Sequence, residues 1–503
     1  MANSYDRLLK TTRARETETP NRNLVLESES DRSRVVFSAP FRRLQQKAQV
    51  FSLEANAAVR SRLTHSFEVA QIGRFLADQI VERLLLDENT LTVIQGRAFI
   101  TFVEVACLMH DLGNPPFGHF GEAAIAQWFK EKGEQHIQVA TGLPTRNSAD
   151  LVKPEVQGAL ADFLEFDGNC QGLRIAALLQ WKDDEYGLNL TYTSLASYLK
   201  YLRSPLFDAS SSKGKLFQKK AGYFGTERKL IEDIWAHFDY SRESPQRFPL
   251  TYVMEAADDI AYCISDLEDS IEKGLLKESH VFQELLNLWQ SDTKEFEYLR
   301  NDEADKIGEV LAAAARNSKG TSRSAFTNFR TNLSRLLTTI ACDSYYDQHT
   351  EIFDGSCEGL ISEKSAGGHI LEMLKTFCRN HVYQHQSVQR TELVGLSAIR
   401  GLLDHFGVLL RCGRKQFDAA MNATNRDKST LFEKKLLSLF PEKHIKAYSH
   451  ACGLNDSNTY LDDHMKNLLE WNLRAHLITD FISGMTDDFA LASFQLLSGI
   501  KTD

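Results

Sequence analysis

The sequence predicts an all-α protein, and three observations carry that prediction. None of the ten prolines falls between residues 250 and 440, although proline is the residue that helix interiors tolerate least. Apolar residues in that stretch recur at steps of three and four, which is the pattern of an amphipathic helix, as at Leu333, Leu336, Leu337 and Ile340. Convincing alternation of apolar and polar residues, the mark of a half-buried strand, is hard to find in the chain.

Helices are expected wherever the same spacing recurs, which is over residues 60–84, 97–109, 119–132, 226–240, 250–274 and 461–483. In the first of these we expect a buried face made of Phe67, Ala70, Ile72, Phe75 and Leu76. Glycines and prolines interrupt the pattern at 133–154, 203–225 and 352–368. Because helical spacing resumes on both sides, we interpret these breaks as loops or insertions rather than domain linkers.

Composition is that of a globular chain in a reducing compartment. The 503 residues are 43% hydrophobic and 25% charged, and the formal charge of -10 gives no general attraction for nucleic acid. The N-terminus is charged throughout, unlike a secretory signal, and no apolar run approaches the length that crosses a bilayer. The eight cysteines are scattered, with no CxxC pair. We therefore expect a cytoplasmic protein without a membrane partner.

A histidine and an aspartate follow each other at the end of an expected helix. His110 and Asp111 close the apolar stretch FITFVEVACLM, and Gly113 with the Pro115–Pro116 pair stops the helix directly afterwards. Side chains held between a helix end and a rigid turn have fixed positions, which suits metal ligation. The His-Asp dipeptide alone does not indicate a metal site, since about one such dipeptide is expected by chance in a chain of this composition.

Two further ligand candidates lie on neighbouring helical segments. His65 falls in RLTHSFEV, and Asp258 falls in EAADDIAY. On the second segment five polar residues share one face, namely Glu255, Asp258, Tyr262, Asp266 and Asp269, and a helix does not normally concentrate negative charge without a cation nearby. Either Asp258 or its neighbour Asp259 could ligate, and the alignment with Tyr262 and Asp266 favours Asp258. Each residue alone is more often a core histidine or a surface acid, but all four in this order favour a metal site.

The mixed ligand set indicates the kind of metal and of chemistry. Two imidazoles and two carboxylates suit a divalent ion such as Mn²⁺, Mg²⁺, Fe²⁺ or Co²⁺. Such an ion could activate water and offset charge developing on phosphorus. His119 and Glu122 lie three residues apart on the next helix, so the carboxylate could hold the imidazole as a general acid or base. The alternative for this pair is a role in capping the helix.

These motifs resemble a known family. The order H…HD…D in RLTHSFEV, HDLGNPPFGHFGE and EAADDIAY resembles the HD-domain deoxynucleotide triphosphohydrolases. The stretches DRSRVVFSAPFRRLQQKAQVF and FISGMTDDFA are similar to the longer, type-1-like bacterial dGTPases. The resemblance runs from about residue 6 to about residue 490. It implies an all-α HD-domain helical bundle with additional helical insertions and a helical C-terminal region.

The resemblance also implies an activity and the residues that serve it. The activity is hydrolysis of dGTP, with other dNTPs as open candidates, to deoxynucleoside and inorganic triphosphate by water attack at the α-phosphorus. The metal, Mn²⁺ or Mg²⁺ with Co²⁺ or Fe²⁺ as alternatives, would be held by His65, His110, Asp111 and Asp258. His119 with Glu122 would serve the reaction at phosphorus.

Substrate contacts follow from the same resemblance. Arg62, Lys200 and Lys220 would hold the triphosphate. Tyr262 would pack on the deoxyribose and exclude a 2′-hydroxyl, Asp266 would meet the 3′-hydroxyl, Gln49 and Val50 would lie near sugar and base, and Glu392 would help to read guanine. The family further implies a homo-oligomer, a hexamer, and binding of single-stranded DNA.

We expect three segments along the chain. Residues 1–58 would form an N-terminal arm with substrate and oligomer contacts, residues 59–275 the HD-domain core with the metal site, and residues 276–503 a helical region that completes the substrate pocket and the oligomer interface. Two other functions stay open on the sequence alone. One is an HD nucleotidase or phosphodiesterase of other specificity, and the other is a nucleotide-sensing protein that binds single-stranded DNA.

Overall fold

The computed structural model describes residues 5–17, 19, 22–54, 56–87, 90–147, 150–180, 184–206, 219–240, 245–319, 325–422 and 429–500. Within these residues the chain forms 22 α-helices with a few 3₁₀ and π turns. The same residues contain no strand beyond four isolated β-bridges. The predicted all-α class is therefore confirmed.

The helices follow one another along the whole described chain. Their bounds are α1 (Tyr5–Leu8), α2 (Leu24–Val36), α3 (Ala39–Arg43), α4 (Arg62–Leu86), α5 (Val93–Met109), α6 (His119–Thr141), α7 (Pro154–Leu164), α8 (Gly168–Arg174), α9 (Tyr192–Tyr198), α10 (Arg228–His237), α11 (Pro249–Glu272), α12 (Glu278–Glu295), α13 (Asp302–Asn317), α14 (Ala325–Asp347), α15 (His349–Asp354), α16 (Ala366–His381), α17 (Gln386–Arg411), α18 (Arg414–Asn422), α19 (Leu431–Leu437), α20 (Glu442–Ser457), α21 (Asp463–Ser483) and α22 (Asp487–Leu497).

Local signals in the sequence set the starts of the three helices that carry the site. Ser61 caps α4, and its side chain and that of Thr64 form a reciprocal capping box. Thr92 and Gln95 form the same box at α5. α11 begins with Pro249, whose missing N–H is one that a first helical residue does not need.

Two of the expected loops are partly helical. α6 continues through Gly133 to Thr141, because Gly133 packs against another helix rather than making a turn. A β-carbon there would lie 2.6 Å from Cδ2 of Leu160. α6 ends at Gly142, which has a left-handed φ of +70°. α16 likewise begins at Ala366, so the two glycines that follow lie inside its first turn.

The predicted buried face of α4 is wrong in part. Ala70 and Leu76 are buried, but Phe67 and Phe75 are 51% and 44% exposed. The helix instead turns small residues toward its neighbours, among them Gly73, where a β-carbon would collide with the side chain of Cys107. Close approach of α4 to α5 thus depends on small residues, and the large aromatic residues face outward.

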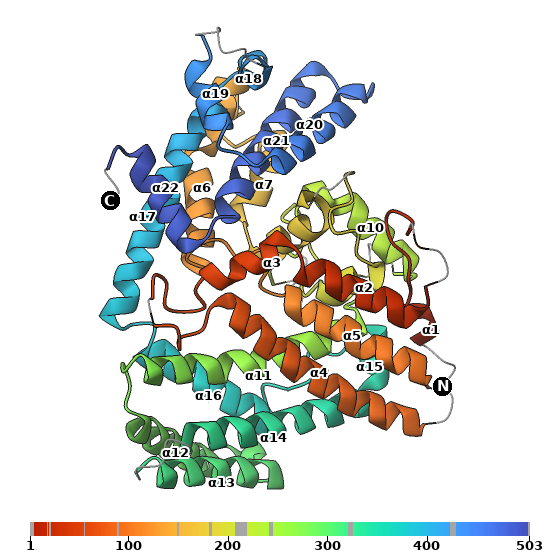
Figure 1. The fold of residues 1–503 in the computed structure, drawn as a ribbon, viewed down its shortest axis with the longest axis vertical. Coiled ribbons are helices and arrows are strands. Elements are labelled where there is room, and N and C mark those ends of the chain that lie inside the picture. Colours follow the sequence, from red (N-terminus) through yellow and green to blue (C-terminus); the bar gives the residue numbers. More distant parts are fainter. Residues whose placement is uncertain are drawn as a thin grey trace.

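Figure 1 shows α4, α5 and α11 packed together across the middle of the molecule. α2 lies against α5, and α14 lies against α4. Below this layer in the figure, α12, α13 and α14 pack with α16. The middle layer supplies the metal-ligand candidates from three helices that contact one another directly.

The upper half of Figure 1 is built on the long helix α17, which packs against α6, α21 and α22. By length and composition alone α17 could span a bilayer, so the expectation that no apolar run approaches that length is wrong for this helix. Its Ile399, Leu402, Leu403 and Phe406 are buried in the protein interior, as in a core helix. The apolar clusters of the protein each draw on more than one of the three expected sequence segments, so those segments pack together.

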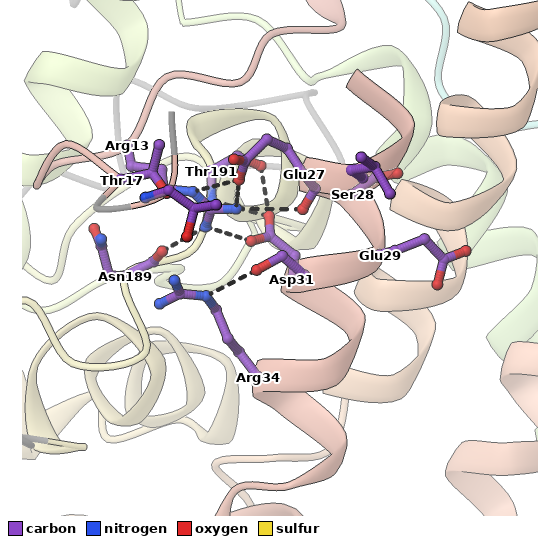
Figure 2. Close-up of polar contacts among 12 residues, drawn as sticks. Arg13, Thr17, Glu27, Ser28, Glu29, Asp31, Arg34, Asn189 and Thr191 are labelled. Atoms are coloured by element: carbon purple, nitrogen blue, oxygen red, sulfur yellow. Dashed lines mark hydrogen bonds and ion pairs between the residues drawn. The ribbon is translucent and has the colours of Figure 1, made fainter. Parts of the chain in front are cut away.

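A buried ion-pair network fixes the N-terminal arm (Figure 2). The guanidinium of Arg13 donates to Glu27, to Asp31 at 2.5 Å and to the carbonyl of Asn189 at 2.6 Å. Oδ2 of Asp31 accepts from the backbone N–H of Thr191 at 2.9 Å and from its hydroxyl at 2.7 Å. Arg13 and Asp31 are 7% and 0% exposed. The network therefore joins the segment around Arg13 to α2 within the arm and to the start of α9.

Candidate active site

The turn after α5 directs Nε2 of His110 toward carboxylate oxygens of Asp111 and Asp258. His110 is the C-cap of α5, and Nδ1 of its ring lies 2.7 Å from the carbonyl oxygen of Cys107. A carbonyl only accepts, so Nδ1 carries the proton and Nε2 keeps a lone pair. Asn114 donates to Oδ1 of Asp111, which leaves Oδ2 for another partner.

The four expected ligands converge in space. Oδ1 of Asp258 lies 3.5 Å from Nε2 of His65 and 3.5 Å from Nε2 of His110. Nε2 of His110 lies 3.5 Å from Oδ2 of Asp111. Ligand atoms bound at about 2.1 Å to one ion lie between about 3 and 4.2 Å apart, so these separations suit a shared ion. His65, His110 and Asp111 each offer one ligand atom, and these three atoms all lie within 4.8 Å of one another.

The electrostatics of the group fit a cation. Within the described part of the chain, Oδ2 of Asp111 accepts no hydrogen bond although it is buried, while Nη1 of Arg62 lies 3.0 Å away without hydrogen-bond geometry. Leaving a buried carboxylate oxygen without a hydrogen bond costs free energy of folding. Burial opposes ionisation of Asp258, but the imidazoles of His110 and His65 and the ammonium of Lys200 hold its pKa well below its usual range. Both acids are thus anionic and available.

The neighbouring acids of α11 have other partners. Asp259 accepts from Nζ of Lys375 at 3.0 Å, so the geometry favours Asp258 over Asp259 as ligand. Glu255 pairs with Arg247 at 2.6 Å, and Asp269 pairs with Arg60 at 2.5 Å. Basic side chains therefore offset much of the negative charge that made this helix face conspicuous in the sequence.

His119 and Glu122 form the expected pair at the start of α6. Nδ1 of His119 lies 2.7 Å from Oε2 of Glu122, and the other carboxylate oxygen accepts from the backbone N–H of Gly168 at 2.7 Å. The hydrogen bond to Glu122 raises the pKa of His119. The His119 side chain is 79% exposed. Its Nε2 is therefore accessible from the cavity, on a ring whose orientation is fixed.

A cavity of about 650 Å³ joins these groups. His110, Asp111, Asp258, His119 and Glu122 line it, and so do the three expected phosphate-binding cations, Arg62, Lys200 and Lys220. The volume is within the range of small-molecule sites.

Each of these cations is paired with an acid in the structure. Arg62 lies beside Asp111, Lys220 pairs with Asp167 at 3.0 Å, and Nζ of Lys200 lies 3.8 Å from Oδ2 of Asp258. Lys200 thus lies beside a ligand candidate.

The lining of the cavity also includes most of the expected sugar and base contacts. Gln49, Val50, Tyr262 and Glu392 line it, and Oε1 of Gln49 is buried without a hydrogen-bond partner in the described chain. Asp266 is not among the lining residues.

Tyr383 stands between Asp266 and the cavity. Its hydroxyl donates to Oδ2 of Asp266 at 2.5 Å and lies 2.6 Å from the hydroxyl of Tyr262. Burial raises the pKa of Asp266 to about 7. Contact between Asp266 and a substrate hydroxyl at Oδ2 would require Tyr383 to give up its hydrogen bond.

Sequence reasoning missed several residues of the site. Asn114 could have been found, because it lies one helical turn after Asp111 in HDLGN, a spacing that brings the two side chains together. Tyr383 and Lys375 line the cavity, and Asp167 pairs with the lining residue Lys220. None of the three gave a signal in the sequence, since each comes from a segment whose place depends on tertiary packing.

Comparison with known proteins gives two findings. The HD domain family model matches residues 62–153, which contain three of the four ligand candidates. Proteins called deoxyguanosinetriphosphate triphosphohydrolase are similar over nearly the whole chain. Those of Salmonella arizonae and Enterobacter sp. are each 35% identical, with 94% of this chain and 94% of the relative covered. That of Yersinia pseudotuberculosis is 33% identical, with 93% of each covered.

Proposed function

The chain belongs to the deoxyguanosinetriphosphate triphosphohydrolase family, and from that premise we propose that it hydrolyses dGTP to deoxyguanosine and inorganic triphosphate with the help of a divalent metal ion. The observation that carries the proposal is the convergence of two imidazoles and two carboxylates at one end of a cavity lined by basic side chains. The metal would be Mn²⁺ or Mg²⁺, with Co²⁺ and Fe²⁺ as alternatives.

His65, His110, Asp111 and Asp258 would hold the metal. A bound divalent ion would supply Lewis-acid chemistry and offset negative charge on the phosphoryl group. The chain itself contributes the fixed geometry of the donors. The Cys107 carbonyl sets the tautomer of His110, and Asn114 orients the carboxylate of Asp111.

We assign the proton transfer to His119. Water adds through its oxygen to the α-phosphorus, the bond from that phosphorus to O5′ breaks, and O5′ needs a proton to leave as a neutral hydroxyl. Nε2 of His119 would deliver that proton, because Glu122 holds the other nitrogen and favours the protonated ring. The proton released by water replaces it over the cycle.

Substrate placement would select the bond that breaks. Arg62, Lys200 and Lys220 would hold the triphosphate on the side of the ligand set. Gln49, Val50, Tyr262 and Glu392 would hold the sugar and the guanine at the other end, with Asp266 reached after Tyr383 moves. A substrate held at both ends presents its α-phosphorus to the metal site and its O5′ to His119.

Product analysis with all four dNTPs and Mn²⁺ tests the proposal. We expect triphosphate and deoxynucleoside in equal amounts, and in ¹⁸O-water we expect the label in triphosphate alone. Orthophosphate or pyrophosphate as first product, or label in the nucleoside, would favour the HD nucleotidase alternative. His110→Ala is the control, since loss of a ligand should abolish hydrolysis while the protein stays folded.

Three further properties belong to the proposal. We expect a homo-oligomer, a hexamer, and the exposed Phe37, Phe67 and Phe75 are consistent with a covered surface. We expect single-stranded DNA to bind that assembly, which sedimentation with labelled oligonucleotide tests.

All eight cysteines are free, which supports a reducing cytoplasm. We also retain residues 1–58, 59–275 and 276–503 as the arm, the core and the C-terminal region.

A further inference from the structure

A buried aspartate of the C-terminal region reaches two backbone segments far away in sequence. Asp487, the first residue of α22, is 4% exposed. Its Oδ2 accepts from the backbone N–H of Ala48 at 3.1 Å, and its Oδ1 accepts from that of Phe117 at 3.1 Å. An acid in the first turn often serves its own helix, but here the side chain of Thr486 caps α22. Asp487 is therefore free to bind the two distant segments.

Lys47 ties the same three parts of the chain together. Its ammonium is buried and donates to the carbonyl of Asn114 at 2.5 Å and to the carbonyl of Ser483 at 2.8 Å. The backbone of Lys47 also accepts from the N–H of Arg62 at 2.8 Å. We refer to Lys47 and Asp487 with these four side-chain hydrogen bonds as the clasp. It joins the end of α21 and the start of α22 to residues 47–48 and 114–117.

Both clasped segments continue directly into the proposed active site. Gln49 and Val50 follow Ala48 and line the cavity, where Oε1 of Gln49 has no hydrogen-bond partner in the described chain. Gly118 and His119 follow Phe117 and line the same cavity. One carboxylate thus restrains a substrate-facing segment and the turn that carries the proposed proton donor.

The turn before His119 needs such restraint. Phe117 has a left-handed φ of +61°, and Gly118 follows with a φ of +57°. A side chain larger than glycine adopts that conformation only where its surroundings enforce it. The hydrogen bond from Phe117 N–H to Asp487 and the contact of the Phe117 ring with Gly395 on α17 are two of those constraints.

We propose that Asp487 is a positioning residue of the active site, which holds His119 through Phe117 and holds Gln49 and Val50 through Ala48. The proposal rests on the proposed function for the roles of those residues. It gives the MTDDF motif at the C-terminus a role in the reaction, although its side chains do not line the cavity.

Asp487→Ala tests the proposal in the full-length protein loaded with Mn²⁺, and Asp488→Ala is the matched control, because Asp488 is exposed in the same helical turn. We expect kcat for dGTP to fall about 10²-fold, as for a reacting group displaced by about 1 Å, and KM to rise. Metal content should stay at the wild-type level. Asp488→Ala should match wild type in kcat, KM and metal content.

A second readout separates positioning from mere stability. In a His119→Ala background, Asp487→Ala should lower kcat no further, because the group through which it acts on kcat is already absent. An equal further loss there would overturn the assignment, and so would wild-type kcat in a folded Asp487→Ala protein. If that variant does not fold, Asp487→Asn keeps the volume and retains one carbonyl acceptor, and it should give an intermediate kcat.

Amide hydrogen exchange tests the clasp independently of catalysis. In whichever Asp487 variant folds, exchange should accelerate at Ala48 and Phe117 while α4 and α5 keep their protection. Unchanged exchange at both amides would overturn the clasp. Absence of triphosphate release by the wild-type protein would instead overturn the proposed function, and the exchange result would still decide on the clasp.

Discussion

Gly395→Ala should damage the active site from outside the cavity. Gly395 lies in the interior of α17 and faces the turn that precedes His119. A β-carbon there would lie 2.6 Å from Cβ and 2.8 Å from Cδ1 of Phe117, well inside van der Waals contact. Phe117 cannot yield freely, because its φ of +61° is already unfavourable and its N–H is bound to Asp487.

Two effects of opposite sign determine how much Gly395→Ala changes the free energy of unfolding. Alanine in a helix interior is more favourable than glycine by about 1 kcal/mol. Overpacking in a close-packed interior costs about 1–3 kcal/mol, so the net loss of unfolding free energy should lie between about 0 and 2 kcal/mol. Displacement of His119 by even a fraction of an ångström should cost more in activity, at least about tenfold in kcat.

Gly453→Ala is the matched control, because Gly453 lies in the interior of α20 and nothing lies within 4 Å of a β-carbon built there. Thermal unfolding, Mn²⁺ content and kcat for dGTP would be measured on both variants. We expect Gly453→Ala to gain stability and keep full activity, and Gly395→Ala to keep its metal and lose rate. If Gly395→Ala gained stability like the control and kept its kcat, the proposed coupling of α17 to the catalytic turn would be wrong.

Three other predictions follow from the contacts of single side chains. Glu122→Gln replaces the carboxylate that raises the pKa of His119 by a neutral amide, which stabilises the protonated ring less. Because the protonated ring is the proposed active form, activity lost as pH rises should be lost at lower pH in the variant, and an unmoved limb of the kcat–pH profile would contradict the assignment. Tyr262→Ala should raise kcat/KM for GTP relative to dGTP, since it opens space beside the sugar; an unchanged ratio would make Tyr262 a packing residue. Asp31→Ala should lower the free energy of unfolding by about 3–5 kcal/mol, because it breaks a buried ion pair. Glu29→Ala on the same helix should cost less, because its ion pair with Arg32 is half-exposed.

Much of the fold and of the metal centre could be predicted because the signals are local. Helical spacing marked α4, α5 and α11, and capping residues lie where α4 and α5 begin, while a proline opens α11. The ligand candidates could be recognised because a helix end followed by two prolines fixes His110 and Asp111 in a short span of sequence. Glycines were interpreted less well, because a glycine used for close helix packing, such as Gly133, looks like a glycine used for a turn.

Long-range pairs could not be predicted for a physical reason. The partner of Asp266 turned out to be Tyr383, and the partners of Asp487 are backbone N–H groups of Ala48 and Phe117. Backbone donors are the same at every residue except proline, so the sequence contains no mark of which one a distant carboxylate will meet. Such contacts follow only from how the helices pack.

The contrast between local signals and long-range contacts divides the active site into two parts. A substitution should be able to impair one part without the other. The metal-ligand candidates lie on α4, on α11 and at the end of α5, and these three helices pack directly on one another. Other parts of the cavity lining come from the arm, from α17 and from the segment after α16. The arm is joined to the bundle by the clasp, and α17 contacts the strained turn at Phe117. Disturbing α17 or α22 should therefore leave metal binding intact while changing KM and proton transfer. Disturbing the contact of α4 with α5 should remove the metal and the activity together.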